Sequence, residues 1–396
     1  MNHADGELVV RRIGRLVTQA GPPLDGPAAV LIRSGRVVWA GPERDLPTGP
    51  ALPELDAGGG CVLPGFVDPH THLLWAGNRR AEFLARLAGE RYDGGGIAST
   101  VAATTAAADA ELLGLARGRV AAMLANGTTT VEIKTGYGLA PAAELRLLGL
   151  ISELAAAVPP RVQATFLAHV VPAGTDRATH VAALAAAMPA AAAAGARWCD
   201  VFCDRGAFTL AETASLLSAA RAAGLGTRLH AEQLANTGAA ALAAEHGCAS
   251  ADHLDLVDAA GAKAMAAADV VGVLLPTATL STRGRAWDTA RTLREAGVTL
   301  ALGTDCNPGT SWCESMPAAM QLSCLLLGLS VDEAVRAATV GGAAALRLPD
   351  VGHLGAGARG DLVVLAADHE ADLIAHLGAR PARRTVIGGE PASGFA

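Results

Sequence analysis

Lysine is almost missing from this chain of 396 residues, which holds only Lys134 and Lys263, and its net charge is −7. We find no basic stripe of the kind that binds a phosphate backbone, so the sequence predicts no nucleic-acid partner. No apolar run free of glycine, proline and charge reaches the roughly 20 residues that span a membrane. Residues 1–8 lack the basic-then-apolar order of a signal peptide. We therefore expect no membrane partner.

Cysteine pairs with metal-binding or redox spacing are also missing. The seven cysteines are odd in number and scattered, and none of them forms a Cys-x-x-Cys pair. This pattern favours free thiols in a reducing compartment over a disulfide framework. The sequence therefore predicts a cytoplasmic protein. With 51% hydrophobic and 17% charged residues, its composition is that of a globular chain with a large core.

The two ends of the chain resemble one another more than either resembles the middle. Short β-type runs occur at residues 29–32 and 36–40, and again at residues 361–365 and 384–387. We expect the two ends to pair into one small β-sandwich domain, with the middle inserted between them. The predicted domains are residues 1–63 together with 346–396 for the β-sandwich, and residues 64–345 for the inserted part.

The middle of the chain alternates short apolar runs with alanine- and leucine-rich helical stretches, a pattern typical of a parallel sheet. Eight such α/β units suggest a (β/α)8 TIM-like barrel. A doubly wound open sheet is the alternative. The distribution of polar residues argues against an open sheet, because these residues follow strands distributed throughout the series of eight. The predicted strands are residues 66–71, 128–134, 161–168, 198–203, 227–231, 249–253, 270–275 and 299–304.

Polar side chains of metal-binding type occur where these strands end. His70 and His72 are one residue apart, so on a strand they point to the same face, as two ligands of one metal ion must. Barrel active sites are assembled at the carboxyl ends of the strands. Four more residues of suitable type fall at the ends of later strands: His169, His230, His253 and Asp305.

This set of side chains predicts a metal-dependent hydrolase. Three imidazoles and a carboxylate suit one Zn²⁺ or Fe ion with an open position for water. Such an ion lowers the pKa of water toward neutrality and so creates a nucleophile. We expect Asp305 to bind the metal or its water and to take the proton, and His253 to polarise the carbonyl group under attack.

Lys134 bears on the number of metal ions. Some barrels of this architecture bridge two ions through a carbamylated lysine on the fourth strand. Lys134 falls on the second predicted strand, and the fourth, at residues 198–203, has no lysine. The sequence therefore favours one ion, with Lys134 in a structural ion pair or in contact with the substrate.

The motifs that surround these residues permit a closer comparison. Residues 64–72, together with His230, His253 and Asp305, resemble the amidohydrolase superfamily. Further stretches resemble the imidazolonepropionase family within it, and the resemblance covers nearly the whole chain. Those stretches are Glu132–Leu139, His230–Leu234, Ser250–Leu254, Thr304–Ser311, Asp200–Cys203 and Gly94–Ile97.

The resemblance implies a specific reaction. That family opens the ring of 4-imidazolone-5-propanoate with water, which gives N-formimino-L-glutamate in histidine degradation, and it leads us to expect a homodimer. It implies that the metal ligands are His70, His72, His230 and Asp305, and that Asp305 and His253 are catalytic. The substrate contacts that it implies are Arg79, Tyr137, His169, Gln233, His253, Asn307, Gly309 and Thr310.

The chemistry of the side chains agrees with several of these roles. The substrate carries a propionate, and the planar fork of Arg79 suits a carboxylate. Tyr137 can donate its hydroxyl, and the amide of Gln233 can donate to or accept from ring nitrogens. In the turn at residues 307–310, Gly309 permits close approach of the backbone and Thr310 offers a hydroxyl. Without the motif, each of these residues would be interpreted as an ordinary surface, packing or turn residue.

Two competing functions are open at this point. A related hydrolase or deaminase of another small heterocycle would share the metal site but would not need Arg79 and Tyr137 as a carboxylate clamp. A barrel kept as a binding or structural module predicts missing ligands, whereas all four are present. The chain also departs from the family pattern: residues 92–94 are shorter than expected, and Thr165 to His169 is one residue short. Cys306 and Cys313 we interpret as small buried residues.

Overall fold

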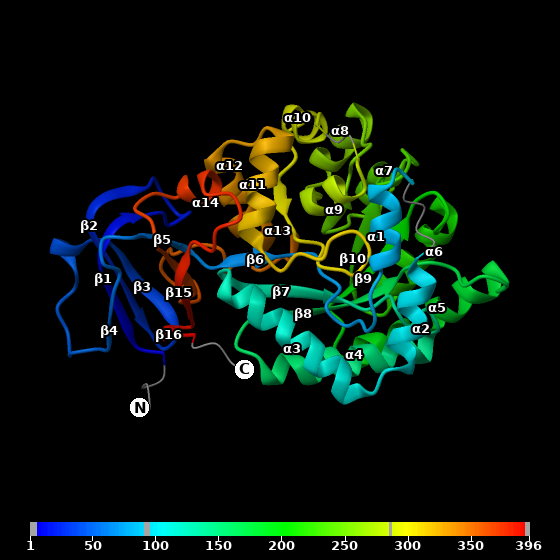
Figure 1. Cartoon of the computed structure of the whole chain (residues 1–396), viewed down its shortest axis with the longest axis horizontal. Helices are drawn as coiled ribbons and strands as arrows, with labels where there is room; N and C mark the ends of the chain where they lie inside the picture. The colour runs from blue at the N-terminus through cyan, green and yellow to red at the C-terminus, as the bar shows by residue number, and fades with distance from the viewer. Residues whose placement is uncertain (1–5, 91–95, 285–286, 393–396) are drawn as a thin grey trace.

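A computed structural model describes residues 6–90, 96–284 and 287–392, and these residues form two eight-stranded sheets (Figure 1). The terminal sheet comes from the two ends of the chain and the barrel sheet from the middle. The terminal sheet contains β1 (Leu8–Leu16), β2 (Leu24–Arg33), β3 (Arg36–Pro42), β4 (Glu54–Asp56), β5 (Cys61–Pro64), β14 (Leu362–Leu365), β15 (Ala382–Ile387) and β16 (Glu390–Pro391). The barrel sheet contains β6 (Phe66–Asp68), β7 (Thr128–Lys134), β8 (Arg161–Ala168), β9 (Trp198–Cys203), β10 (Gly226–Ala231), β11 (Ser250–His253), β12 (Val271–Leu274) and β13 (Leu300–Leu302).

The barrel sheet runs in chain order from β6 to β13, and each neighbouring pair is parallel. Its ends meet just beyond β6 and β13, where Thr71 forms a parallel bridge with Cys306 and the amide of Asp305 donates to the carbonyl of His70 over 3.0 Å. This contact closes the ring of strands. The predicted (β/α)8 barrel is therefore confirmed, and the open doubly wound sheet is excluded.

The eight predicted barrel strands are all present, and most agree with the observed bounds to within one residue. The first is shorter than predicted because it ends at Asp68. The next residue, Pro69, has no amide hydrogen and cannot extend the ladder. Beyond this point the Asp68 carboxylate replaces the strand hydrogen bonds. It accepts from the amides of His70, over 3.3 Å, and Thr304, over 3.1 Å.

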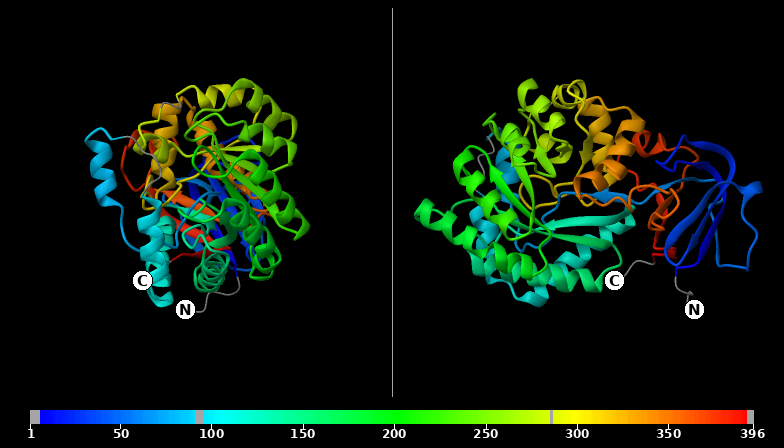
Figure 2. Two further views of the ribbon diagram at one scale, coloured as in Figure 1. Left: turned by 90° about the vertical axis from the view of Figure 1, so that its right-hand side faces the viewer. Right: turned by 180° about the vertical axis from the view of Figure 1, so that it is seen from behind.

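Helices cover the outside of the barrel, as the view from the end away from the terminal sheet shows (Figure 2, left). Strands such as β7, whose seven side chains are all buried, have one face toward the barrel interior and the other toward this layer. The helices are α1 (Arg80–Leu87), α2 (Ile97–Ala106), α3 (Asp109–Ala125), α4 (Pro141–Ala157), α5 (Arg177–Ala193), α6 (Leu210–Ala222), α7 (Ala239–Glu245), α8 (Ala259–Ala267), α9 (Pro276–Ser281), α10 (Thr289–Glu295), α11 (Met316–Leu327), α12 (Val331–Arg336), α13 (Gly342–Ala345) and α14 (Asp372–Ala375), with a short 3₁₀ turn at Glu43–Asp45.

Local sequence signals explain several helix boundaries. The N-terminus of α6 has a capping box in which the Thr209 side chain and Glu212 satisfy each other's backbone amides. Between α12 and α13 lies a π-helical turn, Ala337–Gly341. A Cβ on Gly341 would lie 2.2 Å from the carbonyl oxygen of Leu300, and one on Gly342 would lie 2.4 Å from that of Val67. These two glycines therefore allow the segment to lie directly on the first and last barrel strands.

The terminal sheet joins the two ends of the chain through β5 and β14, which pair antiparallel. Its buried aliphatic side chains form one cluster that draws on β3 near one edge and β15 near the other. The sheet therefore folds over a single core, as predicted for a small β domain built from both ends. The domain boundaries at residues 63/64 and 345/346 stay predictions.

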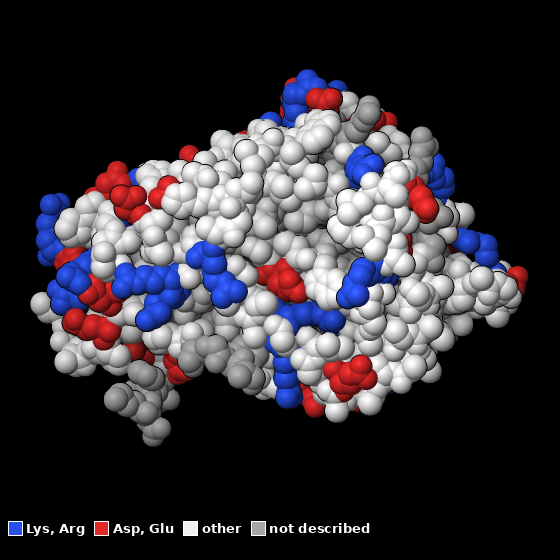
Figure 3. Space-filling view, viewed as in Figure 1, with Lys and Arg blue, Asp and Glu red and all other residues white. Residues whose placement is uncertain are grey.

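The terminal sheet lies against one end of the barrel (Figures 1 and 2). The hydroxyl of Thr385 on β15 donates to the carbonyl of Leu124 in α3 over 3.0 Å, and Arg161 at the start of β8 pairs with Asp350 over 2.9 Å. Charged side chains of both signs gather on the outside of this sheet (Figure 3). Among the described residues, no helix is both long and apolar enough to cross a membrane.

Candidate active site

Five of the six predicted strand-end residues converge at the carboxyl end of the barrel. His70 and His72 follow β6, His230 lies near the end of β10, His253 ends β11, and Asp305 follows β13. All five are at least 97% buried. His253 and Asp305 have positive φ angles of 74° and 50°, a strained conformation for residues that carry a Cβ. Such strain is often found at functional sites.

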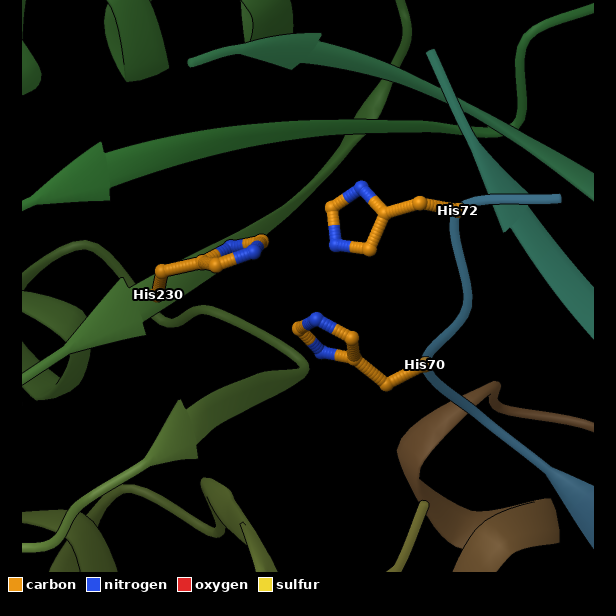
Figure 4. Close-up of side chains that lie close together, drawn as sticks. All are labelled: His70, His72 and His230. Atoms are coloured by element: carbon orange, nitrogen blue, oxygen red, sulfur yellow. The ribbon is translucent and has the colours of Figure 1, made fainter. Parts of the chain in front are cut away.

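The spacing of the ligand atoms fits one metal ion. The ring nitrogens of His70, His72 and His230 all lie within 4.8 Å of one another, and the three rings point toward a common centre (Figure 4). Asp305 Oδ1 lies 3.5 Å from His70 Nε2 and 3.3 Å from His72 Nε2. Neighbouring ligands of a tetrahedral ion with bonds near 2.1 Å are about 3.4 Å apart. The three histidines thus form one group of possible metal ligands, and Asp305 lies beside two of them.

Two of these ring nitrogens have no hydrogen-bond partner within the described part of the chain. They are Nε2 of His70 and Nε2 of His230, and both are buried. A buried polar atom without a partner is costly, so each instance needs an explanation. A bound metal ion would supply the missing partner. The histidine residues of this site are therefore positioned to bind a metal.

His253 is also within reach of the same centre. A ring nitrogen of His253 lies within 4.8 Å of ligand atoms of His70 and Asp305. The structure therefore brings His253 beside the metal site, where the sequence places it. Distance alone does not separate a ligand from a neighbour here, and the assignment of His253 as a catalytic residue stays a prediction.

Burial favours the neutral form of three imidazoles of the site. It lowers the pKa of His70 and His72 well below the ordinary value, and it lowers the pKa of His253 to about 3. A histidine must be neutral to offer a lone pair to a metal ion. Burial raises the pKa of Asp305, against the opposing effect of His253 and His230.

Beneath the imidazoles lies a set of five fully buried ionisable residues, which we call the buried charge layer. It contains two cations and three carboxylates, and each comes from a barrel strand. Burial alone would lower the pKa of Lys134, but the charges of Asp200 and Glu132 outweigh this effect and raise it. The predicted structural ion pair of Lys134 is confirmed. The members of the layer are Glu132, Lys134, Asp200, Arg228 and Asp252.

Two carboxylates of the layer contact proposed metal ligands. Asp252 Oδ2 lies 2.6 Å from Nδ1 of His70, and Asp200 Oδ1 lies 3.0 Å from Nδ1 of His230. No role for these carboxylates was inferred from the sequence. A signal was present, since a charged residue inside an otherwise apolar barrel strand, such as Asp200 in residues 198–203, has to find a buried partner.

A small cavity opens beside the metal site. The structure brings every predicted substrate contact except Gly309 to its wall, and Ile97 and Phe202, which were not predicted, also line it. The predicted residues on the wall are Arg79, Tyr137, His169, Gln233, His253, Asn307 and Thr310.

Arg79 is buried at the wall of this cavity and already has an anionic partner. Its Nε and Nη2 atoms each donate to the carboxylate of Glu82 over 2.8 Å. Arg86 donates to the same carboxylate over 2.7 Å and to the carbonyl of Gly309 over 2.6 Å. Two buried guanidinium groups thus share one carboxylate near the cavity. Glu82 and Arg86 were not predicted, because their roles depend on the fold of α1.

The turn after β13 is held by the side chain of Asn307. Asn307 Oδ1 accepts from the amides of Gly309 and Thr310 over 2.8 Å each, and its Nδ2 donates to Thr310 Oγ1 over 2.9 Å. A Cβ on Gly309 would lie 2.2 Å from Nη1 of Arg79. The glycine therefore makes room for the arginine, and Gly309 takes part in the site although it does not line the cavity. The following helix has its own cap, Ser315.

Tyr137 and His169 lie on the opposite wall, and their ring centroids are 5.6 Å apart. Nδ1 of His169 lies 2.9 Å from the carbonyl of Gly136, which orients the ring. His169 follows β8 and reaches the cavity, so the missing residue before it does not displace it. Cys306 is buried, whereas Cys313 is only half-buried. The short segment at residues 92–94 lies outside the described residues.

The arrangement of fold and site agrees with comparisons to known proteins. The family model described as the amidohydrolase family matches residues 61–392. The chain therefore belongs to the amidohydrolase family. Among solved structures, a triazine hydrolase variant superposes with a TM-score of 0.78 at 18% identity, over 97% of this chain and 94% of the other. An adenosine deaminase from Xanthomonas campestris with bound zinc superposes with a TM-score of 0.74 at 19% identity, over 97% and 92%. At this identity the likeness shows the shared fold.

Curated relatives narrow the family. An imidazolonepropionase of Salinispora arenicola is 49% identical over 395 residues, which cover 97% of this chain and 98% of the relative. An imidazolonepropionase of Myxococcus xanthus is 45% identical, over 97% of this chain and 96% of the relative. Within the amidohydrolases, the chain thus falls in the imidazolonepropionase family.

Proposed function

We propose that this enzyme hydrolyses the cyclic amide C–N bond of 4-imidazolone-5-propanoate, which gives N-formimino-L-glutamate in histidine degradation. The observation that carries the proposal is the shared cavity: three of the predicted metal ligands, His72, His230 and Asp305, and the buried Arg79 line the same cavity. A lactam ring with a propionate tail needs both features. The relatives named above support the same reaction.

We propose that His70, His72, His230 and Asp305 hold one divalent or trivalent ion, either zinc or iron. Imidazole and carboxylate ligands suit both metals. When bound, the ion supplies a Lewis acid that polarises the carbonyl group and makes water more acidic. The remaining steps depend on the side chains of the protein.

We propose that Asp305 moves the proton during ring opening. Its carboxylate lies beside the imidazoles on one side and His253 on the other. It takes a proton from water as the oxygen of that water adds to the lactam carbonyl carbon. When the C–N bond breaks, Asp305 returns the proton to the departing ring nitrogen. His253, which is neutral, donates a hydrogen bond to the developing oxyanion.

The substrate tail would lie toward Arg79. The charge of its guanidinium is shared with Glu82, and a propionate carboxylate is a second anion for the same group. Tyr137, His169, Gln233, Asn307 and Thr310 line the remaining wall and limit the size of the ring that fits. Gly309 allows Arg79 to reach the cavity.

We also propose a homodimer in the cytoplasm. The seven cysteines are free thiols in the structure, which suits a reducing compartment. Size-exclusion chromatography with light scattering measures the assembly directly. A monomer at micromolar concentration would refute the dimer and leave the proposed reaction untouched.

A direct assay tests the proposed reaction. The purified protein should consume 4-imidazolone-5-propanoate with loss of imidazolone absorbance and formation of N-formimino-L-glutamate. If it instead releases ammonia from a cytosine- or guanine-type base and leaves the imidazolone intact, the chain is a deaminase and the proposal is wrong. An analogue that lacks the propionate should be a poor substrate.

A further inference from the structure

We propose that the buried charge layer positions the metal-binding imidazoles, and that Lys134 is the positioning residue at its centre. This inference rests on the metal site of the proposed function. Among the described residues, the ion-pair partners of Lys134 are Glu132, Asp200 and Asp252, and none of these is predicted to bind the metal or the substrate. Its effect would pass through the carboxylates that it holds.

The contacts form two branches that start from Lys134. In the first, Lys134 Nζ lies 2.7 Å from Asp200 Oδ2, and the other oxygen of Asp200 lies 3.0 Å from Nδ1 of His230. In the second, Lys134 Nζ lies 3.8 Å from Asp252 Oδ2, and that oxygen lies 2.6 Å from Nδ1 of His70. One ammonium group is thus linked to two of the three ligand imidazoles.

Neighbouring groups hold both branches in place. Arg228 Nη2 donates to Asp252 Oδ2 over 3.0 Å, and Ser250 Oγ donates to Asp252 Oδ1 over 2.6 Å. Glu132 accepts from Lys134 Nζ over 2.9 Å, and Thr165 donates to the same carboxylate. The carboxylates therefore have little freedom to rotate.

The contacts with Asp252 and Asp200 select one tautomer of the His70 and His230 imidazoles. A neutral ring carries its proton on one nitrogen only, and a carboxylate at Nδ1 places the proton there. Nε2 then keeps its lone pair and points to the metal site. This agrees with the buried Nε2 atoms of His70 and His230, which have no hydrogen bond within the described residues. Outer contacts of this kind orient metal ligands and raise their affinity for the ion.

A purely structural role is the alternative. Buried ion pairs contribute little net stability, because removing two charges from water costs about as much as their attraction returns. Five buried ionisable residues under a metal site are therefore a poor way to stabilise a barrel. A positioning role predicts a loss of metal affinity in the folded variant, whereas a structural role predicts a loss of stability alone.

The test compares the only two lysines of the chain. Lys134→Met removes the buried ammonium, and Lys263→Met removes an exposed one as a matched control. For each full-length protein, Zn²⁺ affinity is measured by chelator competition, and Co²⁺ binding is followed by its visible absorption. We expect Lys134→Met to bind Zn²⁺ about 10- to 100-fold more weakly with an altered Co²⁺ spectrum, and Lys263→Met to match the wild type.

A milder pair of variants covers the case in which Lys134→Met does not fold. Ser250→Ala removes one hydrogen bond to Asp252 without a change of charge, and we expect about three- to tenfold weaker Zn²⁺ binding. Thr130→Val is the control, since Thr130 is buried on β7 and its hydroxyl has no hydrogen-bond partner among the described residues. We expect its Zn²⁺ affinity to be unchanged.

The outcomes separate this inference from the proposed function. If the wild type binds no Zn²⁺ or Co²⁺, the metal site itself is refuted. If the wild type binds and a folded Lys134→Met binds equally tightly with the same spectrum, only the positioning role is refuted. Equal Zn²⁺ affinity in Ser250→Ala and Thr130→Val would refute it in the same way.

Discussion

The barrel sheet and the terminal sheet each have eight strands, yet their buried side chains differ. The interior of the barrel holds the buried charge layer and the imidazoles above it. The core of the terminal sheet is a cluster of aliphatic residues such as Val10, Val30 and Ile32. Both sets of side chains are buried, so solvent access does not explain the difference.

The comparison indicates which property of the protein each sheet mainly supports, stability or the metal site. Each buried CH₂ group contributes about 0.8 kcal/mol to folding, so an aliphatic core is the direct way to stabilise a sheet. A buried charge costs several kcal/mol unless its partners are in place. The barrel accepts this cost where it supports the predicted metal ligands. Substitutions in the two sheets should therefore affect different properties.

The largest effect is expected at the metal site. His230→Ala should abolish metal binding and lower kcat/KM by about three orders of magnitude or more, because Lewis-acid catalysis contributes several kcal/mol. Metal analysis and the imidazolone assay check this. The thermal midpoint of the metal-free protein should change little. A variant that keeps both its metal and its rate would show that His230 is not a ligand.

The terminal sheet should give the reverse result. Ile32 is fully buried in the aliphatic cluster, so Ile32→Ala should lower the free energy of unfolding by about 2–4 kcal/mol. Urea denaturation measures this loss. The rate per folded molecule and the metal content should match the wild type. A fall in kcat at a temperature where the variant is fully folded would break the proposed division between the two sheets.

The carboxylate contact should show a smaller and more selective effect. Arg79→Ala should reduce kcat/KM for 4-imidazolone-5-propanoate by about 10- to 100-fold, mainly through KM, because a hydrogen bond to a charged group contributes about 1.5–3 kcal/mol. The adjacent and exposed Arg80 offers the matched control Arg80→Ala. An equal loss on an analogue without the propionate would argue against the carboxylate role.

The smallest effect concerns a buried acid of the terminal sheet. Burial raises the pKa of Asp361 from 3.8 to about 6, so the folded state binds its proton more tightly than the unfolded state does. The resulting stabilisation is present below about pH 4 and is lost as the pH rises through 6. Asp361→Asn removes this titration. Relative to the variant, the wild type should lose about 1–3 kcal/mol of stability between pH 4 and pH 6. Parallel stability curves for the two proteins would contradict this assignment.

The fold followed from the sequence because its signals are local. Alternating apolar and helical segments indicate a barrel, and the observed strands lie close to their predicted positions. The exception at Asp68 has a local cause in Pro69. That the two ends of the chain join in one β domain was also anticipated, because both ends have similar short β-type runs. The strand β5, which makes the connection by pairing with β14, was not among the predicted runs.

The candidate site was only partly accessible to sequence reasoning. The predicted ligands could be found because each lies at or just beyond the end of a strand, and strand ends meet in a barrel. The contacts of Asp200 and Asp252 with the histidines link residues 30 and 182 positions apart. No local pattern reports such distances. The sharing of Glu82 by Arg79 and Arg86 depends likewise on how α1 lies over the turn after β13.

The most direct test of the account is the dependence of turnover on the metal. The purified protein should contain one zinc or iron ion per chain and should hydrolyse 4-imidazolone-5-propanoate. Removal of the ion by a chelator should abolish the loss of imidazolone absorbance, and addition of Zn²⁺ or Fe²⁺ should restore it. Full turnover by the metal-free protein would contradict the central claim that the clustered histidines and Asp305 form a catalytic metal site.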